Sequence, residues 1–379
     1  MRNRLHWLPA LVALIGIAGR AAAGVLPEDR ADLLYHVYDG GGVQIDGPSL
    51  LVRKTFLEKI SVVGNYYMDM VSSASIDVVT TASPYKEKRK QWSLGVDALR
   101  GKTTYSLNYI NSKENDYDAN TASFSLSQDM FGDLTTVTLG FSRGWDTVRR
   151  NNDPTFEEPL DRRSYSVGVS QIITKNLIVG AAFETITDEG FLNNPYRSVR
   201  YLDPTSGTGY SFQAEIYPHT HTSNAFAVNG KYYLPFRAAV SGEYRYYSDT
   251  WGIVAHTADV GYTMPWQKKW IFDADVRYYT QNHADFFSDL FPRSDAQNFE
   301  GRDKELATFD SYAIGFGATY EFPGGRPRFV QKGTLNVRYD HIWFDYKDFR
   351  DIRVSAPPGT EPLYSFEADV LQLFASIWF

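Results

Sequence analysis

From residue 89 onward, the chain repeats segments of about 10–13 residues in which apolar and polar side chains alternate. In 308–322, for example, Tyr312, Ile314 and Phe316 fall on one face, and small or polar residues stand between them. A side-chain period of two describes a strand with one apolar side. Repeated segments of this length are typical of transmembrane barrels, whose strands face lipid on one side and the lumen on the other.

The connectors between these segments also alternate in length. Short turns lie at 99–102, 130–133, 173–176, 234–237 and 264–269. Between them lie loops, most of them long, at 70–88, 113–118, 146–160, 188–222, 249–251, 282–307 and 346–365. Outer-membrane barrels have short periplasmic turns and longer external loops, whereas a soluble sandwich would not place its long loops so consistently at one end.

The pattern predicts an all-β fold, a single antiparallel transmembrane β-barrel. The last strand, 366–379, should end on the periplasmic side. A barrel with an even number of strands then needs a first strand that starts on the periplasmic side. Residues 32–39 can supply this strand, and Gly40-Gly41-Gly42 then opens the first loop. The expected strands are 32–39, 49–57, 60–69, 89–99, 102–112, 119–129, 134–145, 161–172, 177–187, 223–234, 237–248, 252–264, 269–281, 308–322, 332–345 and 366–379. They number 16, or 14 if the first two are not membrane strands.

The N-terminus has the three parts of a secretory signal peptide. Arg2 and Arg4 are basic, 8–18 is a short apolar stretch, and Ala21-Ala22-Ala23 fits the small-residue cleavage rule. A membrane anchor is the alternative, but the apolar stretch is too short to span a bilayer. We therefore expect a signal peptide at 1–23, a periplasmic segment at 24–31 and the barrel at 32–379.

The last strand carries a predicted assembly signal. One of its faces consists of Leu371, Leu373, Ala375, Ile377 and Phe379. An alternating final strand that ends in phenylalanine resembles the signal read by the barrel-assembly machinery of Gram-negative bacteria. Together with the export signal and the repeats, it predicts a location in the bacterial outer membrane, in contact with outer-membrane lipid and lipopolysaccharide.

Composition narrows the chemistry. The 379 residues include no cysteine, so disulfides and thiolate metal sites are excluded. The formal net charge of −7 gives no broad basic field for nucleic acid. The mature histidines are surrounded by no hydrolase motif, so an outer-membrane hydrolase is a lesser alternative and we expect neither an enzyme nor a cofactor.

Alternation assigns a set of charged residues to the lumen. They are Asp97, Glu184, Glu243, Arg245, Asp259, Asp273, Asp275, Arg277, Glu321, Arg338 and Asp340. One interpretation is a charged constriction that selects permeants. The other is a closed lumen filled with mutually paired charges, since buried charges are unfavourable unless paired. The many lumen positions occupied by Gly, Ser or Ala leave space at the axis and favour a pore.

One wall sector dominates the expected lumen charge. Asp273, Asp275 and Arg277 share a strand face, Glu243 and Arg245 share another, and the strand between them adds Asp259. Four acids and two arginines leave a net charge of about −2 if all are ionised. The sector predicts a slight preference for cations.

Two further groups are candidates for binding. His219 and His221 beside Glu215 suit zinc by ligand type, but two histidines near a strand start arise as often by chance. Arg149-Arg150 and Arg162-Arg163 flank an external loop and could hold lipopolysaccharide phosphates.

Four segments are distinctive: 71–87, 186–204, 232–239 and 288–305. Together they resemble an uncharacterised family of proteobacterial outer-membrane β-barrel proteins, classed as a domain of unknown function. The resemblance covers nearly the whole mature chain and implies a barrel, without established site residues. Its members are often encoded near a small lipoprotein, a thioredoxin-like protein and a flavin transferase, which implies a link to periplasmic redox or flavin handling.

Two functions are therefore open. The first is a porin-like channel for small hydrophilic solutes with a slight cation preference. The second is a non-conducting barrel scaffold whose loops or lumen hold a partner, such as the small lipoprotein. The loops at 188–222 and 282–307 are long enough to fold into the lumen, and loops of such length usually have a function.

Overall fold

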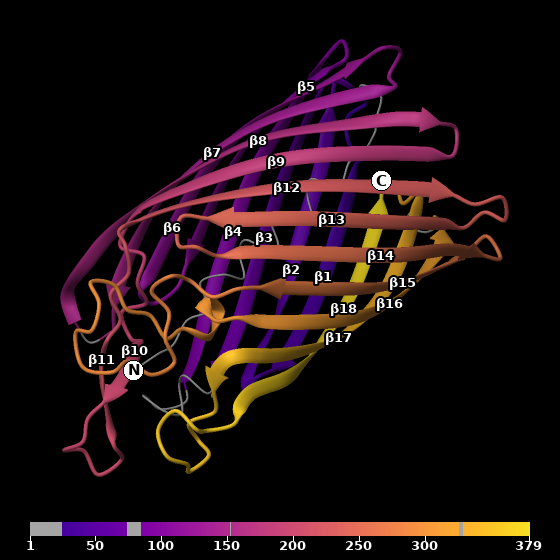
Figure 1. Cartoon of the computed structure of the whole chain (residues 1–379). Coiled ribbons are helices and arrows are strands. Elements are labelled where there is room, and N and C mark those ends of the chain that lie inside the picture. Colours follow the sequence, from indigo (N-terminus) through magenta and orange to yellow (C-terminus); the bar gives the residue numbers. More distant parts are fainter. Residues whose placement is uncertain (1–24, 74–84, 152, 326–328) are drawn as a thin grey trace.

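A computed structural model describes residues 25–73, 85–151, 153–325 and 329–379, and the expected signal peptide lies outside them. Within these residues, sixteen antiparallel strands close into one barrel (Figure 1). They are β1 (Arg30–Gly40), β2 (Val43–Phe56), β3 (Ile60–Ser73), β4 (Tyr85–Arg100), β5 (Thr103–Lys113), β6 (Tyr117–Met130), β7 (Thr135–Arg150), β8 (Asp153–Thr174), β9 (Leu177–Gly190), β12 (Thr220–Tyr233), β13 (Ala239–Asp249), β14 (Val254–Trp266), β15 (Trp270–Gln281), β16 (Phe309–Pro323), β17 (Lys332–Arg350) and β18 (Leu363–Trp378). The predicted fold and the count of 16 are confirmed, and 14 is excluded.

The barrel closes where β1 pairs with β18, with Arg30 opposite Trp378. Around the ring, strands adjacent in sequence are adjacent in space, except that β12 follows β9. The segment between those two contains β10 (Ser198–Leu202) and β11 (Tyr210–Ala214), which form a separate two-stranded sheet. No helix in the described part of the chain is long and apolar enough to cross a membrane.

The two faces of the barrel wall differ as the alternation predicts. Large apolar side chains project from the outer face, where Leu107, Val260 and Phe316 are each about 60% exposed. The residues between them along each strand face the lumen. The apolar outer band includes Leu94, Leu107, Leu139, Val167, Phe183, Val228, Val260, Phe272, Phe316, Leu335 and Leu373. Such a surface is unfavourable in water and requires an apolar surrounding.

Several connectors are shorter than the sequence predicted. Gly40 ends β1 instead of opening a loop, because Gly41 and Gly42 adopt φ of 59° and 79° and form a two-residue hairpin turn. The expected loop 146–160 is also wrong in extent, since β7 and β8 continue to Arg150 and from Asp153. Ladder hydrogen bonds extend there beyond the apolar band, where outward positions such as Thr147, Arg149 and Glu157 are polar and no apolar outer face marks the strand.

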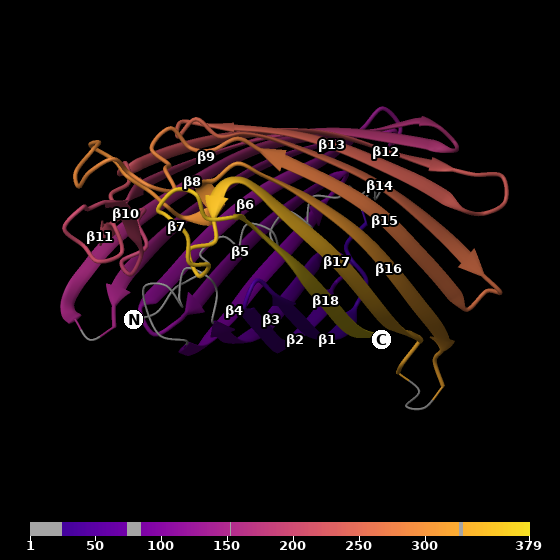
Figure 2. The same ribbon diagram turned by 60° about the horizontal axis from the view of Figure 1, so that its bottom comes forward.

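Three connectors pack together at the end of the barrel opposite the C-terminus (Figure 2). They are 191–219, 282–308 with its short helix η2 (Lys304–Leu306), and 351–362, and we call them the external cap. With the β13–β14 connector and the ends of adjacent strands they enclose a hydrophobic core of Tyr217, Trp251, Ile253, Ala284, Phe286, Phe287, Leu306, Ala307, Tyr346, Phe349 and Tyr364. The long external loops therefore have a packed interior of their own.

Candidate functional site: a charged lumen beneath an external cap

A row of charges crosses three adjacent strands on the lumen face. Glu243 of β13 lies opposite Asp259 of β14, which lies opposite Arg277 of β15. Asp259 interacts electrostatically with both neighbours and with Asp275. Among the described residues, no hydrogen bond or ion pair engages the side chains of Glu243, Asp259 and Arg277, and Glu243 is exposed. Charges without fixed partners are available to interact with ions in the lumen.

In a second group of charges, one guanidinium lies between two carboxylates. The Nη2 of Arg338 lies 2.8 Å from Oδ1 of Asp275 and 2.5 Å from Oδ1 of Asp340. These residues come from β17 and β15, and Gly315 of β16 stands between them in the ladder. A Cβ on Gly315 would overlap side-chain atoms of Arg338 and Asp340, so the glycine leaves room for the guanidinium to cross the strand.

The remaining predicted lumen charges lie on the inner face but separately. Asp273 accepts a hydrogen bond from Thr263 Oγ1 at 2.7 Å, and the Arg245 guanidinium lies 5.7 Å from the ring centre of Tyr247. Asp97 pairs with Arg53 at 2.6 Å, and Glu184 accepts from Ser164 at 2.7 Å. Glu321 lies near the periplasmic end of β16 and is exposed. The sector predicted on β13–β15 is thus brought together, and β17 extends it.

Sequence reasoning missed a lumen cluster on the N-terminal strands. His36 Nε2 lies 2.9 Å from Oδ1 of Asp69, whose other oxygen pairs with Arg89. Tyr67 stacks on His36 with ring centres 5.2 Å apart. β2 and β3 keep one register across Gly47 and Pro48, but in the sequence of β2 either face is acceptable as the outer one, so alternation alone did not assign inner and outer faces here. Polar residues two apart along the chain, such as Tyr67 and Asp69, were the available signal.

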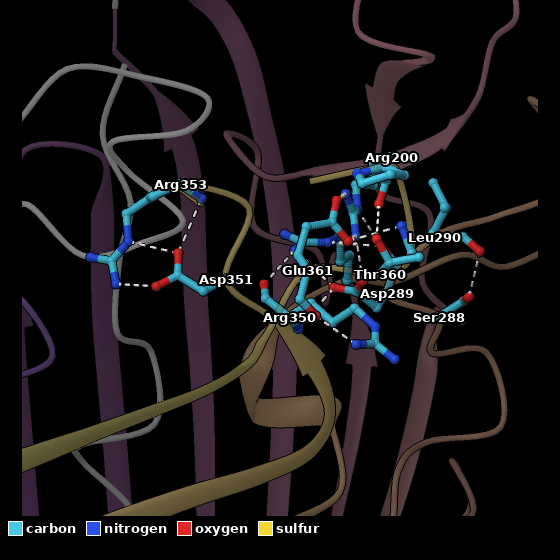
Figure 3. A network of polar contacts seen from close by, with 12 residues as sticks. Arg200, Ser288, Asp289, Leu290, Arg350, Asp351, Arg353, Thr360 and Glu361 are labelled. Atoms are coloured by element: carbon cyan, nitrogen blue, oxygen red, sulfur yellow. Dashed lines mark hydrogen bonds and ion pairs between the residues drawn. The ribbon is translucent and has the colours of Figure 1, made fainter. Parts of the chain in front are cut away.

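The external cap is held by a buried arginine (Figure 3). Arg200 is fully buried and donates from Nη2 to Oδ2 of Asp289 at 2.5 Å and from Nη1 to Oε1 of Glu361 at 2.6 Å. Arg302 pairs with the other oxygen of Asp289 at 2.8 Å. Residues from all three cap segments therefore meet in one network of charge-assisted hydrogen bonds, which are stronger than neutral ones.

The cap crosses the external opening. Tyr196 donates to Asp116 in the β5–β6 connector, and Arg200, four residues later, reaches Glu361 in the β17–β18 connector. Around the ring those two connectors lie ten strand positions apart in one direction and six in the other. One short stretch of chain thus contacts nearly opposite sides of the rim, so it lies over the lumen and narrows the opening.

Electrostatics favour the closed cap. Burial alone would raise the pKa of Glu361, but hydrogen bonds from Arg200 and from the backbone hold the pKa below its ordinary value. Burial likewise opposes the charge of Arg200, yet its two carboxylate partners raise its pKa. Both groups therefore carry full charge at neutral pH.

The structure does not gather the candidate zinc ligands. His221 lies between Asp249 at 3.0 Å and Asp188 at 3.5 Å, whereas His219 contacts the carbonyl of Gly190 at 3.1 Å. Glu215 instead accepts from Tyr217. Within the described residues, no group of three or more His, Cys, Asp or Glu side chains could hold a metal ion.

The expectation that Arg162 and Arg163 could both hold lipopolysaccharide phosphates is wrong for Arg162. Arg162 faces inward and its Nε lies 2.6 Å from Oδ1 of Asp188, because consecutive strand residues point to opposite sides. Arg163 faces outward, and Arg149 pairs with Glu157 at 3.0 Å.

On β18, the predicted assembly-signal residues Leu371, Leu373, Ala375 and Ile377 share the outer face, and the backbone N–H of Phe379 donates to the backbone carbonyl of Asp29.

A closed barrel with an apolar outside and a charged, polar inside is an outer-membrane β-barrel, and this chain resides in the bacterial outer membrane. Residues 70–340 match the family model described as "Protein of unknown function (DUF3570)", so the chain belongs to that family.

The barrel also resembles solved structures at low identity. A "Bacterial polysaccharide outer membrane secretin" is 8% identical with a TM-score of 0.48, covering 93% of this chain and 100% of that one. A FadL homologue of Pseudomonas aeruginosa is 10% identical with a TM-score of 0.47 over 96% of this chain and 93% of that one. OmpT of Vibrio cholerae is 12% identical with a TM-score of 0.44 over 94% and 100%. No curated protein sequence matches this chain.

Proposed function

We infer that the protein is a channel for small hydrophilic solutes with a slight preference for cations, and that the external cap limits the size of what enters. The observation that carries this inference is the row of Glu243, Asp259 and Arg277 on the lumen wall, whose side chains form no hydrogen bond or ion pair among the described residues. A barrel sealed by its own side chains would pair such charges, as burial without partners is unfavourable.

The charge balance supplies the cation preference. The acids of the sector are Glu243, Asp259, Asp273, Asp275 and Asp340, and its bases are Arg245, Arg277 and Arg338. Five acids against three bases leave about −2 if all are ionised. Rings of acidic side chains select cations in channels, and screening restricts the effect to about 8 Å at physiological salt.

The test is ion conductance of the refolded, full-length protein in planar bilayers. We expect discrete conductance steps from the wild type and larger steps from Arg200→Met, which loosens the cap without touching the lumen wall. Arg353→Met is the matched control, since Arg353 lies in the 351–362 segment of the cap but forms a partly exposed pair with Asp351. Absence of conductance from all three folded proteins would contradict the channel.

A second function, a non-conducting scaffold for a partner, is favoured by the packed core of the external cap. Loops that pack around their own buried aromatic residues hold a fixed shape. Such loops could present a binding surface to a partner. The family resemblance supplies a small lipoprotein as a candidate partner. This proposal predicts no conductance from Arg200→Met but co-purification of a lipoprotein with the wild type, lost when the cap is loosened.

A further inference from the structure

Cationic side chains gather on one sector of the outer wall, just external to the apolar band. Lys90 of β4 lies directly opposite Lys113 of β5, and Arg143 of β7 lies directly opposite Arg163 of β8. Lys88 lies on the same outer face of β4. Side chains opposite each other in an antiparallel pair have Cβ atoms about 4.5–5.5 Å apart, and like charges there are destabilising. Two such pairs on one sheet face are unfavourable unless anionic groups compensate them.

The internal compensation is incomplete. Both Arg143 and Arg163 share a single carboxylate, Asp161, at 2.7 and 3.1 Å. Their side chains remain 54% and 47% exposed, so guanidinium donors point into the surroundings. Lys113 has Asp118 at 3.3 Å and is 66% exposed. The five cations, set against Asp118, Asp161 and Glu189 on the same face, leave a net charge of about +2.

The surroundings identify the class of anion. Directly beneath the arginine pair, Phe141 and Tyr165 pack with ring centres 5.2 Å apart and face the hydrocarbon. On the opposite side of the ring, outward positions at the external end are acidic, as Asp345 and Glu367 show. A lipid that binds the cationic sector would therefore present its anionic group at the level of the arginines and its acyl chains at the level of the rings.

We propose that the outer faces of β7 and β8 bind a phosphate group of an outer-leaflet glycolipid through Arg143 and Arg163, with Lys90 and Lys113 contacting the rest of the anionic headgroup. Two guanidinium groups can each donate paired hydrogen bonds to phosphate oxygens, which is the geometry that makes arginine a phosphate ligand. The site lies outside the lumen and is independent of any channel.

The experiment measures binding of bis-phosphorylated lipid A to the purified full-length protein in detergent by native mass spectrometry. The Arg143→Gln/Arg163→Gln variant should bind at least about tenfold more weakly, as charge-assisted bonds to phosphate are lost. Lys347→Gln is the control, because Lys347 is an external, outward lysine in a one-to-one pair with Asp310 at 3.2 Å. Its affinity should be unchanged.

Further arms separate the sources of phosphate. Dephosphorylated lipid A with the same acyl chains should bind as weakly as lipid A binds the double variant, and inorganic phosphate should not compete at millimolar concentration. Arg143→Lys/Arg163→Lys should keep more affinity than the glutamine variant, which excludes a folding defect as the cause. Equal binding by wild type and the glutamine variant, or equal binding of the dephosphorylated lipid, would overturn the proposal.

Discussion

Replacing Arg200 with methionine should open the external cap while leaving the barrel folded. Removing one partner of a buried ion pair typically costs about 3–5 kcal/mol, because the other charge stays buried. Asp289 would keep Arg302 at 2.8 Å, and Glu361 would keep the backbone N–H of Gly359 at 2.8 Å, so the lower end of that range applies. A loss of about 3 kcal/mol corresponds to cap opening that is roughly a hundredfold more frequent.

Hydrogen–deuterium exchange measures this opening segment by segment. Amides of 191–219, 282–308 and 351–362 should exchange roughly a hundredfold faster in Arg200→Met, while those of β13–β16 should not change. Arg353→Met breaks the pair between Arg353 and Asp351, in which the arginine side chain is 46% exposed. Exposed pairs contribute about 0.2–1 kcal/mol, so this substitution should change the exchange rates by less than tenfold. Equal effects of the two substitutions would refute the reasoning that burial of Arg200 holds the cap.

Three further outcomes follow from the same structure. The pKa of Glu361 is held below its ordinary 4.5, so its stabilisation is present above that pH and is lost as pH falls through the lowered pKa. Protection of the amides of 351–362, measured relative to their intrinsic exchange rates at each pH, should therefore fall in acid in the wild type but not in Glu361→Gln. Phe316→Arg puts a guanidinium into the hydrocarbon and should lower the free energy of unfolding by about 2–4 kcal/mol in denaturant titrations in lipid, whereas Phe316→Leu should not. Gly315→Val should displace Arg338 from Asp275, because the added side chain would overlap the guanidinium. We expect a changed channel conductance from a variant that still folds, as judged by its heat-dependent mobility on gels. Unchanged conductance would contradict this prediction.

The barrel was predictable because the bilayer imposes a period of two wherever a strand crosses it. β15 and β16 alternate cleanly, so their inward Asp275 and outward Phe316 could be assigned from sequence. The extensions of β7 and β8 were not predictable, since outside the bilayer the outward face needs no apolar residues. The same alternation, applied to Arg162 and Arg163, would have separated them.

The external cap could not be derived, because its contacts join segments far apart in the chain. Arg200 meets Asp289 and Glu361 across 89 and 161 residues, and no periodicity links loops. One signal was present: Phe286, Phe287 and Phe291 are concentrated in a single loop, and aromatic residues in a connector indicate that it packs against something. What it packs against required the structure.

The reversal potential of the reconstituted protein under a salt gradient tests the central claim most directly. At about 0.01 M salt the Debye length is about 30 Å, so the sector charge of about −2 should favour cations in the wild type. Glu243→Gln/Asp259→Asn should remove that preference, and Asp273→Asn/Asp275→Asn should shift it in the same direction. Asp345→Asn/Glu367→Gln, which removes two acids from the outer face, should leave it unchanged. Conductance with identical selectivity in all four proteins would remove the sector from the permeation path and contradict the account.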